Sequence, residues 1–189
     1  MVTKITNNVL EPFLSRPDEK IHLAEIAKTI NTPHPTARQW LNKLEEQGIL
    51  RKEHKGRQTL YSLNKENPLT AEYLVIAEKN KLIKKCEESL ILKELVHQLN
   101  KELPDNTKAV IFGSTAEDPE KSEDIDLLII GKENEKQIKE ISNKINKKIH
   151  LINTSTKEKI TITLKKEIIK KHLIIKGSEE LVRWMIWQA

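Results

Sequence analysis

Cysteine, glycine and aromatic residues are scarce in this chain of 189 residues. It has one cysteine, Cys86, and five glycines, and 4% of its residues are aromatic. A single cysteine excludes an intrachain disulfide framework and a zinc cluster built from cysteines. No run of 18 consecutive apolar residues occurs, so no membrane span is expected. The first residues lack the apolar stretch of a signal peptide, and together these absences predict a cytoplasmic protein without a membrane partner.

Charge is abundant by contrast, at 32% of residues, with 33 Lys and Arg against 28 Asp and Glu. The resulting net charge of +5 favours contact with nucleic acid or another anionic surface. A lysine-rich solvated surface would give the same total, so the positions of the basic residues must decide. The length suits two small domains joined by a helix.

The first third of the chain has the pattern of three helices followed by a hairpin. Apolar residues recur at helical spacing over 3–14, 22–30 and 35–48, with Ile5 in the first segment. Two short alternating runs within 49–63 flank a basic turn, which predicts a β-hairpin. This order is that of a winged helix-turn-helix.

The third helix would be the recognition helix, which lies in the major groove of DNA. Arginine can pair with guanine, glutamine with adenine, and a threonine methyl can contact thymine. Basic residues at the hairpin tip suit phosphate or minor-groove contacts. The predicted DNA-binding residues are Thr36, Arg38, Gln39 and Lys43 of the helix, and Lys55 and Arg57 of the wing.

The segment from Leu44 to Leu50, Leu-Glu-Glu-Gln-Gly-Ile-Leu, resembles the end of the recognition helix in winged-helix regulators of the arsenic-repressor and multiple-antibiotic-resistance type. The resemblance covers residues 1–64 and implies double-stranded DNA as a partner. Three-helix modules of this kind also mediate protein contacts, which is the alternative.

A nearly continuous helical pattern follows over residues 70–102. Its first part carries an apolar stripe that little else in the chain would cover, formed by Leu69, Tyr73, Ile76 and either Leu82 or Ile83. We expect this stripe to pair with a second chain, because a two-fold homodimer places two recognition helices one turn of DNA apart. Packing of the stripe against the chain's own domains is the alternative.

Strands and helices alternate after Pro104. Strands are expected at 108–112, 125–130, 148–152 and 172–175, and helices at 133–147, from Thr154 or Ser155, and at 178–187. The first strand ends at Gly113-Ser114, and Asp124-Ile125-Asp126 follows after nine residues. Free backbone amides at such a turn can bind phosphate. The two aspartates point to one side of their strand because side chains alternate, and adjacent carboxylates make an oxygen site for Mg²⁺.

This strand, Gly-Ser turn, helix and Asp-x-Asp strand resemble the DNA polymerase β superfamily, most closely its minimal nucleotidyltransferases, over residues 90–189. The resemblance implies that Gly113 and Ser114 contact the phosphates of a nucleoside triphosphate. It also implies that Asp124 and Asp126 are catalytic residues that bind Mg²⁺.

The superfamily also uses a third acid, on the strand after the next helix. Here that segment reads Lys-Ile-His-Leu-Ile, with His150 at the position of the acid. An imidazole can act as a base or a ligand, or His150 can be a strand residue without chemistry. Glu158 is a nearby acid, expected on a helix. Without the third carboxylate we expect little or no catalysis.

The sequence therefore predicts an α+β protein with a winged helix-turn-helix at 1–66, a connecting and dimerisation helix at 67–88, and a nucleotidyltransferase-like domain with a small mixed sheet at 89–189. It resembles an archaeal type of transcriptional regulator that binds DNA and senses a nucleotide or contacts a protein partner. The alternative is an active enzyme that transfers a nucleoside monophosphate to a protein, as antitoxin-type relatives do, or to RNA.

Overall fold

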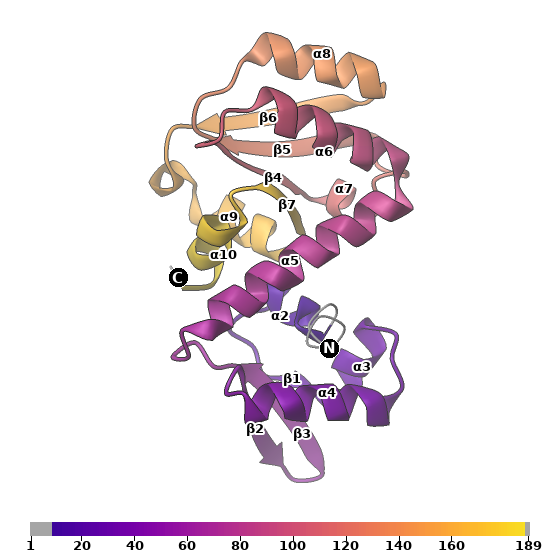
Figure 1. Cartoon of the computed structure of the whole chain (residues 1–189), viewed down its shortest axis with the longest axis vertical. Coiled ribbons are helices and arrows are strands. Elements are labelled where there is room, and N and C mark those ends of the chain that lie inside the picture. The colour runs from indigo at the N-terminus through magenta and orange to yellow at the C-terminus, as the bar shows by residue number, and fades with distance from the viewer. Residues whose placement is uncertain (1–8, 188–189) are drawn as a thin grey trace. The chain divides into compact units, whose positions relative to one another are not determined.

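The computed structural model describes residues 9–187 (Figure 1). By its internal contacts the described chain divides into two compact units. The N-terminal unit comprises the described residues up to Lys81 and those from Val182 on, and the C-terminal unit comprises Leu82–Leu181. Both units mix helices with a small sheet, so the predicted α+β class is confirmed.

Over the described residues 9–63, the N-terminal unit contains three helices and a three-stranded antiparallel sheet. The helices are α2 (Glu11–Ser15), α3 (Leu23–Thr29) and α4 (His34–Glu46), and the strands are β1 (Ile21–His22), β2 (Leu50–Lys55) and β3 (Gln58–Leu63), in the order β1-β3-β2. The two-residue strand β1 was not predicted, because it is too short to show alternation. Of the predicted helix 3–14, residues 3–8 with Ile5 lie outside the described residues.

The core of this unit forms where the apolar faces of α3 and α4 meet the hairpin. Ile26, Ala37, Leu41, Leu44 and Tyr61 are all buried, and full burial of a large apolar side chain contributes about 1.5–3 kcal/mol. α4 ends before Gly48, which has a φ of +72°. This left-handed conformation suits glycine and turns the chain into β2.

The helical pattern over 70–102 is two helices, α5 (Leu69–Glu88) and α6 (Leu90–Glu102). The predicted helical pattern is confirmed, with a single break at Ser89, whose side chain accepts a hydrogen bond from the backbone N–H of Leu92 at 3.1 Å. A serine that caps the next helix in this way adopts extended backbone angles and ends the helix before it.

The C-terminal residues also depart from the expected boundaries. α10 (Ser178–Trp187) lies where a terminal helix was predicted, but from Val182 on it groups with the N-terminal unit. Trp187 Nε1 donates to the carbonyl oxygen of Lys65 at 3.1 Å, and the guanidinium of Arg183 pairs with Glu72 at 2.5 Å. These contacts explain why the helix does not belong wholly to the second domain.

The C-terminal unit is built on a four-stranded sheet in the order β6-β5-β4-β7. β5 and β6 are parallel and the other neighbours are antiparallel, so the predicted mixed sheet is confirmed. Its strands are β4 (Lys108–Phe112), β5 (Asp124–Ile130), β6 (Lys148–Thr154) and β7 (His172–Lys176). Besides α6, the unit contains the helices α7 (Ser114–Glu117), α8 (Glu135–Ile145) and α9 (Ile162–Lys170).

The helix expected from Thr154 or Ser155 is wrong. β6 continues its parallel pairing with β5 as far as Thr154, opposite Ile130. A short 3₁₀ turn at Lys157–Lys159 follows, and α9 begins only at Ile162, where the side chain of Thr161 accepts from the N–H of Leu164. Pairing with a neighbouring strand has overridden the local helical pattern.

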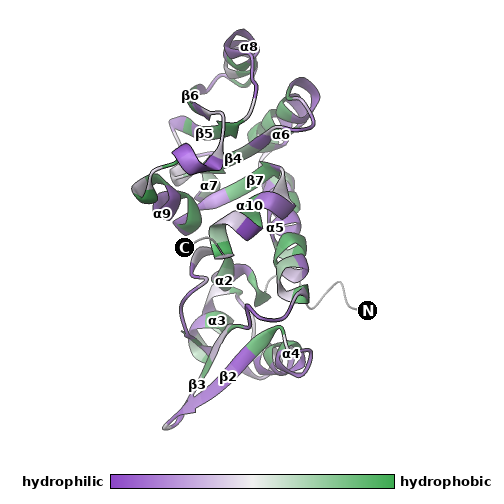
Figure 2. Cartoon of the chain, turned by 90° about the vertical axis from the view of Figure 1, so that its left-hand side faces the viewer, coloured by the Kyte–Doolittle hydropathy of each residue, from purple (hydrophilic) through white to green (hydrophobic). Residues whose placement is uncertain are grey.

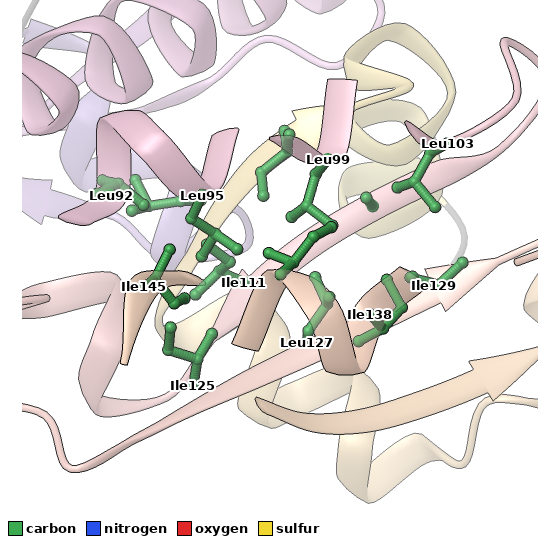
Figure 3. Close-up of a cluster of buried hydrophobic side chains, with 14 of the residues drawn as sticks. Leu92, Leu95, Leu99, Leu103, Ile111, Ile125, Leu127, Ile129, Ile138 and Ile145 are labelled. Atoms are coloured by element: carbon green, nitrogen blue, oxygen red, sulfur yellow. The ribbon is translucent and has the colours of Figure 1, made fainter. Parts of the chain in front are cut away.

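One face of this sheet is covered by α6 and α8. Figure 3 shows leucines of α6 and isoleucines of α8 directed toward alternate residues of β5. Ile125, Leu127 and Ile129 point into this cluster, so Asp124 and Asp126 point to the opposite face. α9 lies on that opposite side of the sheet (Figure 2). In the described part of the chain no helix is both long and apolar enough to span a membrane.

Candidate functional site

The aspartates of β5 lie beside His150 of β6. The parallel register sets His150 opposite Asp126. Its Nε2 lies 3.5 Å from Oδ2 of Asp124, and its Nδ1 lies 3.6 Å from Oδ1 of Asp126. All three side chains are about two-fifths exposed, at 44% for Asp124, 39% for Asp126 and 45% for His150. The structure thus brings together three residues that the sequence singled out, on a surface open to solvent.

The turn after β4 passes close to Asp126. Gly113 has a φ of +74°, and a Cβ at this position would lie 2.8 Å from Oδ2 of Asp126. The N–H of Gly113 donates to the carbonyl oxygen of Lys171 at 3.2 Å, so this amide is already engaged within the fold. Thr115 ties the turn to the aspartate strand, because its hydroxyl donates to the carbonyl oxygen of Asp124 at 2.7 Å.

A cavity of about 490 Å³ opens in front of these groups. Four predicted residues border it: Ser114, Asp124, Asp126 and His150. So do five residues that sequence reasoning missed, all from the segment between the Gly-Ser turn and β5: Glu117, Asp118, Lys121, Ser122 and Glu123. The signal that could have found them is the density of charge in that nine-residue segment.

The additional carboxylates have different surroundings. Glu117 pairs with Lys171 at 2.7 Å. Asp118 accepts from Lys121 at 2.8 Å, and this hydrogen bond and the accompanying charge lower the pKa of Asp118 and raise that of Lys121. The side chain of Glu123 is exposed and has no hydrogen bond or ion pair to the described residues. Glu158 lies in the 3₁₀ turn and does not border the cavity.

Lys147 stabilises the segment between the Gly-Ser turn and β5. Its ammonium group donates to the carbonyl oxygen of Pro119 at 2.7 Å, to that of Glu120 at 3.1 Å, and to that of Ser122. Three charge-assisted hydrogen bonds from one side chain fix the backbone of the segment that carries the cavity residues not predicted from the sequence. The outline of the cavity therefore depends on a residue outside it.

The oxygen groups suit a hard cation that is also bound by a ligand. Mg²⁺ is usually held by one or two carboxylates, with waters and substrate phosphates completing its shell, and the exposed side chains of Asp124 and Asp126 meet that need. Across residues 9–187 no cluster of three or more His, Cys, Asp or Glu side chains is arranged to hold a metal alone. The site thus fits Mg²⁺ only together with a phosphate ligand.

The predicted DNA-binding residues lie on α4 and on the hairpin. Arg38, Gln39 and Lys43 are exposed and Thr36 is partly buried, while Lys55 and Arg57 are exposed at the hairpin tip. The tip is hydrophilic (Figure 2). Asn42 of α4 is engaged instead, because its Oδ1 accepts from Lys52 Nζ and from the hydroxyl of Tyr61, both at 2.9 Å. Burial raises the pKa of that tyrosine.

Two family models match the chain. The IclR helix-turn-helix domain matches residues 8–54, and the nucleotidyltransferase domain matches residues 91–176. A search of curated proteins finds no match. A solved structure described as "Crystal structure of the toxin-antitoxin with AMP-PNP" is 12% identical with a TM-score of 0.41, and the similarity covers 51% of this chain and 81% of that one. This similarity is too low to carry an argument. The family matches confirm the predicted pair of domains: the chain joins an IclR-type helix-turn-helix DNA-binding domain to a nucleotidyltransferase domain.

Proposed function

We propose that this protein is a DNA-binding transcriptional regulator whose C-terminal domain binds a Mg²⁺-nucleotide or a protein partner and transfers little or no nucleotide. The N-terminal helix-turn-helix domain supports the first half of this proposal. The second half depends on the neighbourhood of Asp124 and Asp126.

The observation that carries it is the position of His150. Its ring lies within 3.6 Å of both aspartates, in register with Asp126 on the neighbouring strand. An imidazole there supplies no negative charge to a second metal ion. A general base typically contributes about 10²- to 10⁴-fold to a rate, so a site without the usual third acid is expected to be slow.

Ground-state binding does not need that acid. Asp124 and Asp126 would hold one Mg²⁺, which would neutralise phosphate charge, and the Ser114 hydroxyl at the edge of the cavity can donate to a phosphate oxygen. The cavity of about 490 Å³ lies within the range for small-molecule sites.

Calorimetry with Mg²⁺-ATP tests nucleotide binding by the C-terminal domain. Incorporation of α-labelled nucleotide into protein and RNA acceptors tests nucleotide transfer. We expect weak binding that Asp124→Asn/Asp126→Asn abolishes, and incorporation far below one turnover per second. His150→Asp should raise a feeble rate, whereas His97→Asp, an exposed change on α6, should not. Metal-dependent turnover near one per second in the parent would refute the proposal.

An active nucleotidyltransferase is the second candidate, and Glu123 favours it. This exposed carboxylate borders the cavity with Asp124 and Asp126 and has no hydrogen bond or ion pair to the described residues. It could accept the proton of an attacking hydroxyl. If the parent proves active, Glu123→Gln should reduce incorporation by at least tenfold while Glu158→Gln leaves it unchanged.

The DNA-binding half predicts that the full chain retards duplex DNA in a gel. Replacing Arg38, Gln39, Lys55 and Arg57 together by alanine should weaken retardation at low and moderate salt, because cationic contacts to phosphate dominate affinity. A quadruple variant that binds as the parent does would remove DNA from the proposed function.

A further inference from the structure

A second cavity, of about 220 Å³, lies in the helix-turn-helix unit between the start of α4 and the wing. It is lined by His22, Leu23, Ala24, His34, Arg38, Arg57, Gln58 and Thr59. No carboxylate borders it. Two arginines and two histidines, from β1, α4 and the wing, therefore line one small space.

The arginines of this cavity differ from the others in the chain. Of the five arginines, Arg16 pairs with Glu25, Arg51 with Glu66 and Arg183 with Glu72. Arg38 and Arg57 have neither an ion pair nor a hydrogen bond to the described residues, and both border the cavity. The two arginines that have no acidic partner among the described residues thus border the same cavity.

We propose that this cavity binds a single phosphate group of the DNA backbone, contacted by Arg38 and Arg57 together. The inference rests on the proposed DNA-binding function and deepens it. A cavity of about 220 Å³ is large beside the roughly 30 Å³ of a water molecule and smaller than the roughly 300 Å³ at which small-molecule pockets begin. It therefore suits a phosphate group with a few waters.

The chemistry of the lining agrees with this ligand. A guanidinium group presents a planar fork of N–H donors that matches phosphate oxygens. The rings of His22 and His34 each carry an N–H even when neutral. A phosphate in this cavity would be bound by donors from β1, from the recognition helix and from the wing.

This changes the role expected of Arg38. The sequence assigns Arg38 to guanine recognition, whereas its place with Arg57 in the lining of one cavity assigns it to the DNA backbone. Phosphate contacts fix the register of a protein on DNA and carry no sequence information. Base reading is then left to residues outside the cavity, with Gln39 and Lys43 exposed on the same helix.

The salt dependence of binding tests whether the two arginines share a phosphate. Affinities of the full-length parent, Arg38→Ala, Arg57→Ala and the double variant are measured against salt, on a duplex selected from a random pool and on its scrambled version. Each neutralised phosphate contributes about 0.9 to the slope of log affinity against log salt. We expect the double variant to lose about 0.9, with non-additive single effects and an unchanged ratio between the duplexes.

Arg51→Ala is the matched control, since it removes an arginine that is already paired with Glu66 outside the cavity, and its slope should equal that of the parent. Circular dichroism confirms that each variant is folded. A loss of about 1.8 in the double variant, as for two separate phosphates, would overturn the inference, as would an unchanged slope or a changed ratio between the duplexes with Arg38→Ala.

Inorganic phosphate at constant ionic strength separates DNA from a free anion. Weak competition with DNA that disappears in the double variant supports the shared chemistry. Tight phosphate binding in a protein whose double variant keeps the parental DNA slope would assign the cavity to a free anion and overturn the inference alone. A parent that binds no duplex at low salt would overturn both the inference and the proposed DNA binding.

Discussion

Gly113 is the single residue on which the geometry of the aspartate site depends most directly. Its φ of +74° and ψ of −148° are open to glycine alone, and an added Cβ would meet the Asp126 carboxylate at 2.8 Å. Gly113→Ala should reduce the free energy of unfolding by about 1–3 kcal/mol. It should also weaken Mg²⁺-nucleotide binding, because the carboxylate must move. Urea denaturation and calorimetry measure the two effects.

Gly56 provides the matched control at the tip of the hairpin. Its φ is +60°, and nothing lies within 4 Å of an added Cβ, so Gly56→Ala adds backbone strain without a clash. We expect a cost of about 1–2 kcal/mol and unchanged nucleotide binding. Equal effects of the two substitutions on nucleotide binding would show that the close approach to Asp126 has no functional role.

At the scale of elements, the segment between α7 and β5 depends on Lys147. Replacing this residue by methionine keeps the length of the side chain and removes its hydrogen bonds to three carbonyl oxygens. We expect a loss of about 2 kcal/mol of stability, since hydrogen bonds to a charged group contribute about 1.5–3 kcal/mol each and water replaces part of them. Amide hydrogen exchange over 118–123 should become faster.

Lys148→Met is the control for that change. Lys148 is the adjacent residue, is exposed, and begins β6. Its replacement should leave exchange over 118–123 as in the parent. Equal exchange in the Lys147 and Lys148 variants would contradict the role given to the ammonium group of Lys147.

The sequence predicts those elements whose periodicity matches their environment. Ile125, Leu127 and Ile129 of β5 join one core cluster at alternate positions, and α8 carries Ile138, Ile141 and Ile145 at helical spacing toward the core. The same alternation predicts that Asp124 and Asp126 share a face. β1 and the start of α9 could not be predicted, because pairing with distant strands determines one and the length of β6 determines the other.

The candidate sites were predictable only in part for a similar reason. The spacing of the Gly-Ser turn and the aspartates is a local pattern, and it brings Ser114, Asp124, Asp126 and His150 to one cavity. Glu123 and its neighbours border that cavity because hydrogen bonds from Lys147 hold the backbone of their segment. Lys147 lies 25 or more residues along the chain from the carbonyl groups that it contacts. The convergence of Arg38 and Arg57 likewise depends on tertiary structure, which no local pattern encodes.

At the scale of the whole molecule, α5 carries the surface that we expect to form a homodimer. Leu69, Ile76 and Ile83 are 54%, 45% and 55% exposed and lie seven residues apart, so they follow one side of the helix. Leu82, the alternative fourth member, packs against the core of the C-terminal unit instead. Sedimentation equilibrium at tens of micromolar should show a dimer.

Ile76→Glu/Ile83→Glu should weaken that dimer at least about 100-fold, since two buried isoleucines contribute about 3 kcal/mol or more. Ile162→Glu is the control, because Ile162 is 75% exposed on α9 and its replacement should leave the dimer intact. A parent that sediments as a monomer at this concentration would rule out the interface.

Asn42 has a consequence for the energetics of DNA recognition. Its side-chain oxygen accepts hydrogen bonds from Lys52 on β2 and Tyr61 on β3, so the recognition helix and the wing are joined before any ligand arrives. Ordering of mobile segments on association opposes binding, and a wing that is already fixed loses little conformational entropy at that moment. We therefore expect the recognition helix and the wing to bind DNA as a preorganised unit, because folding of the chain already fixes their relative position.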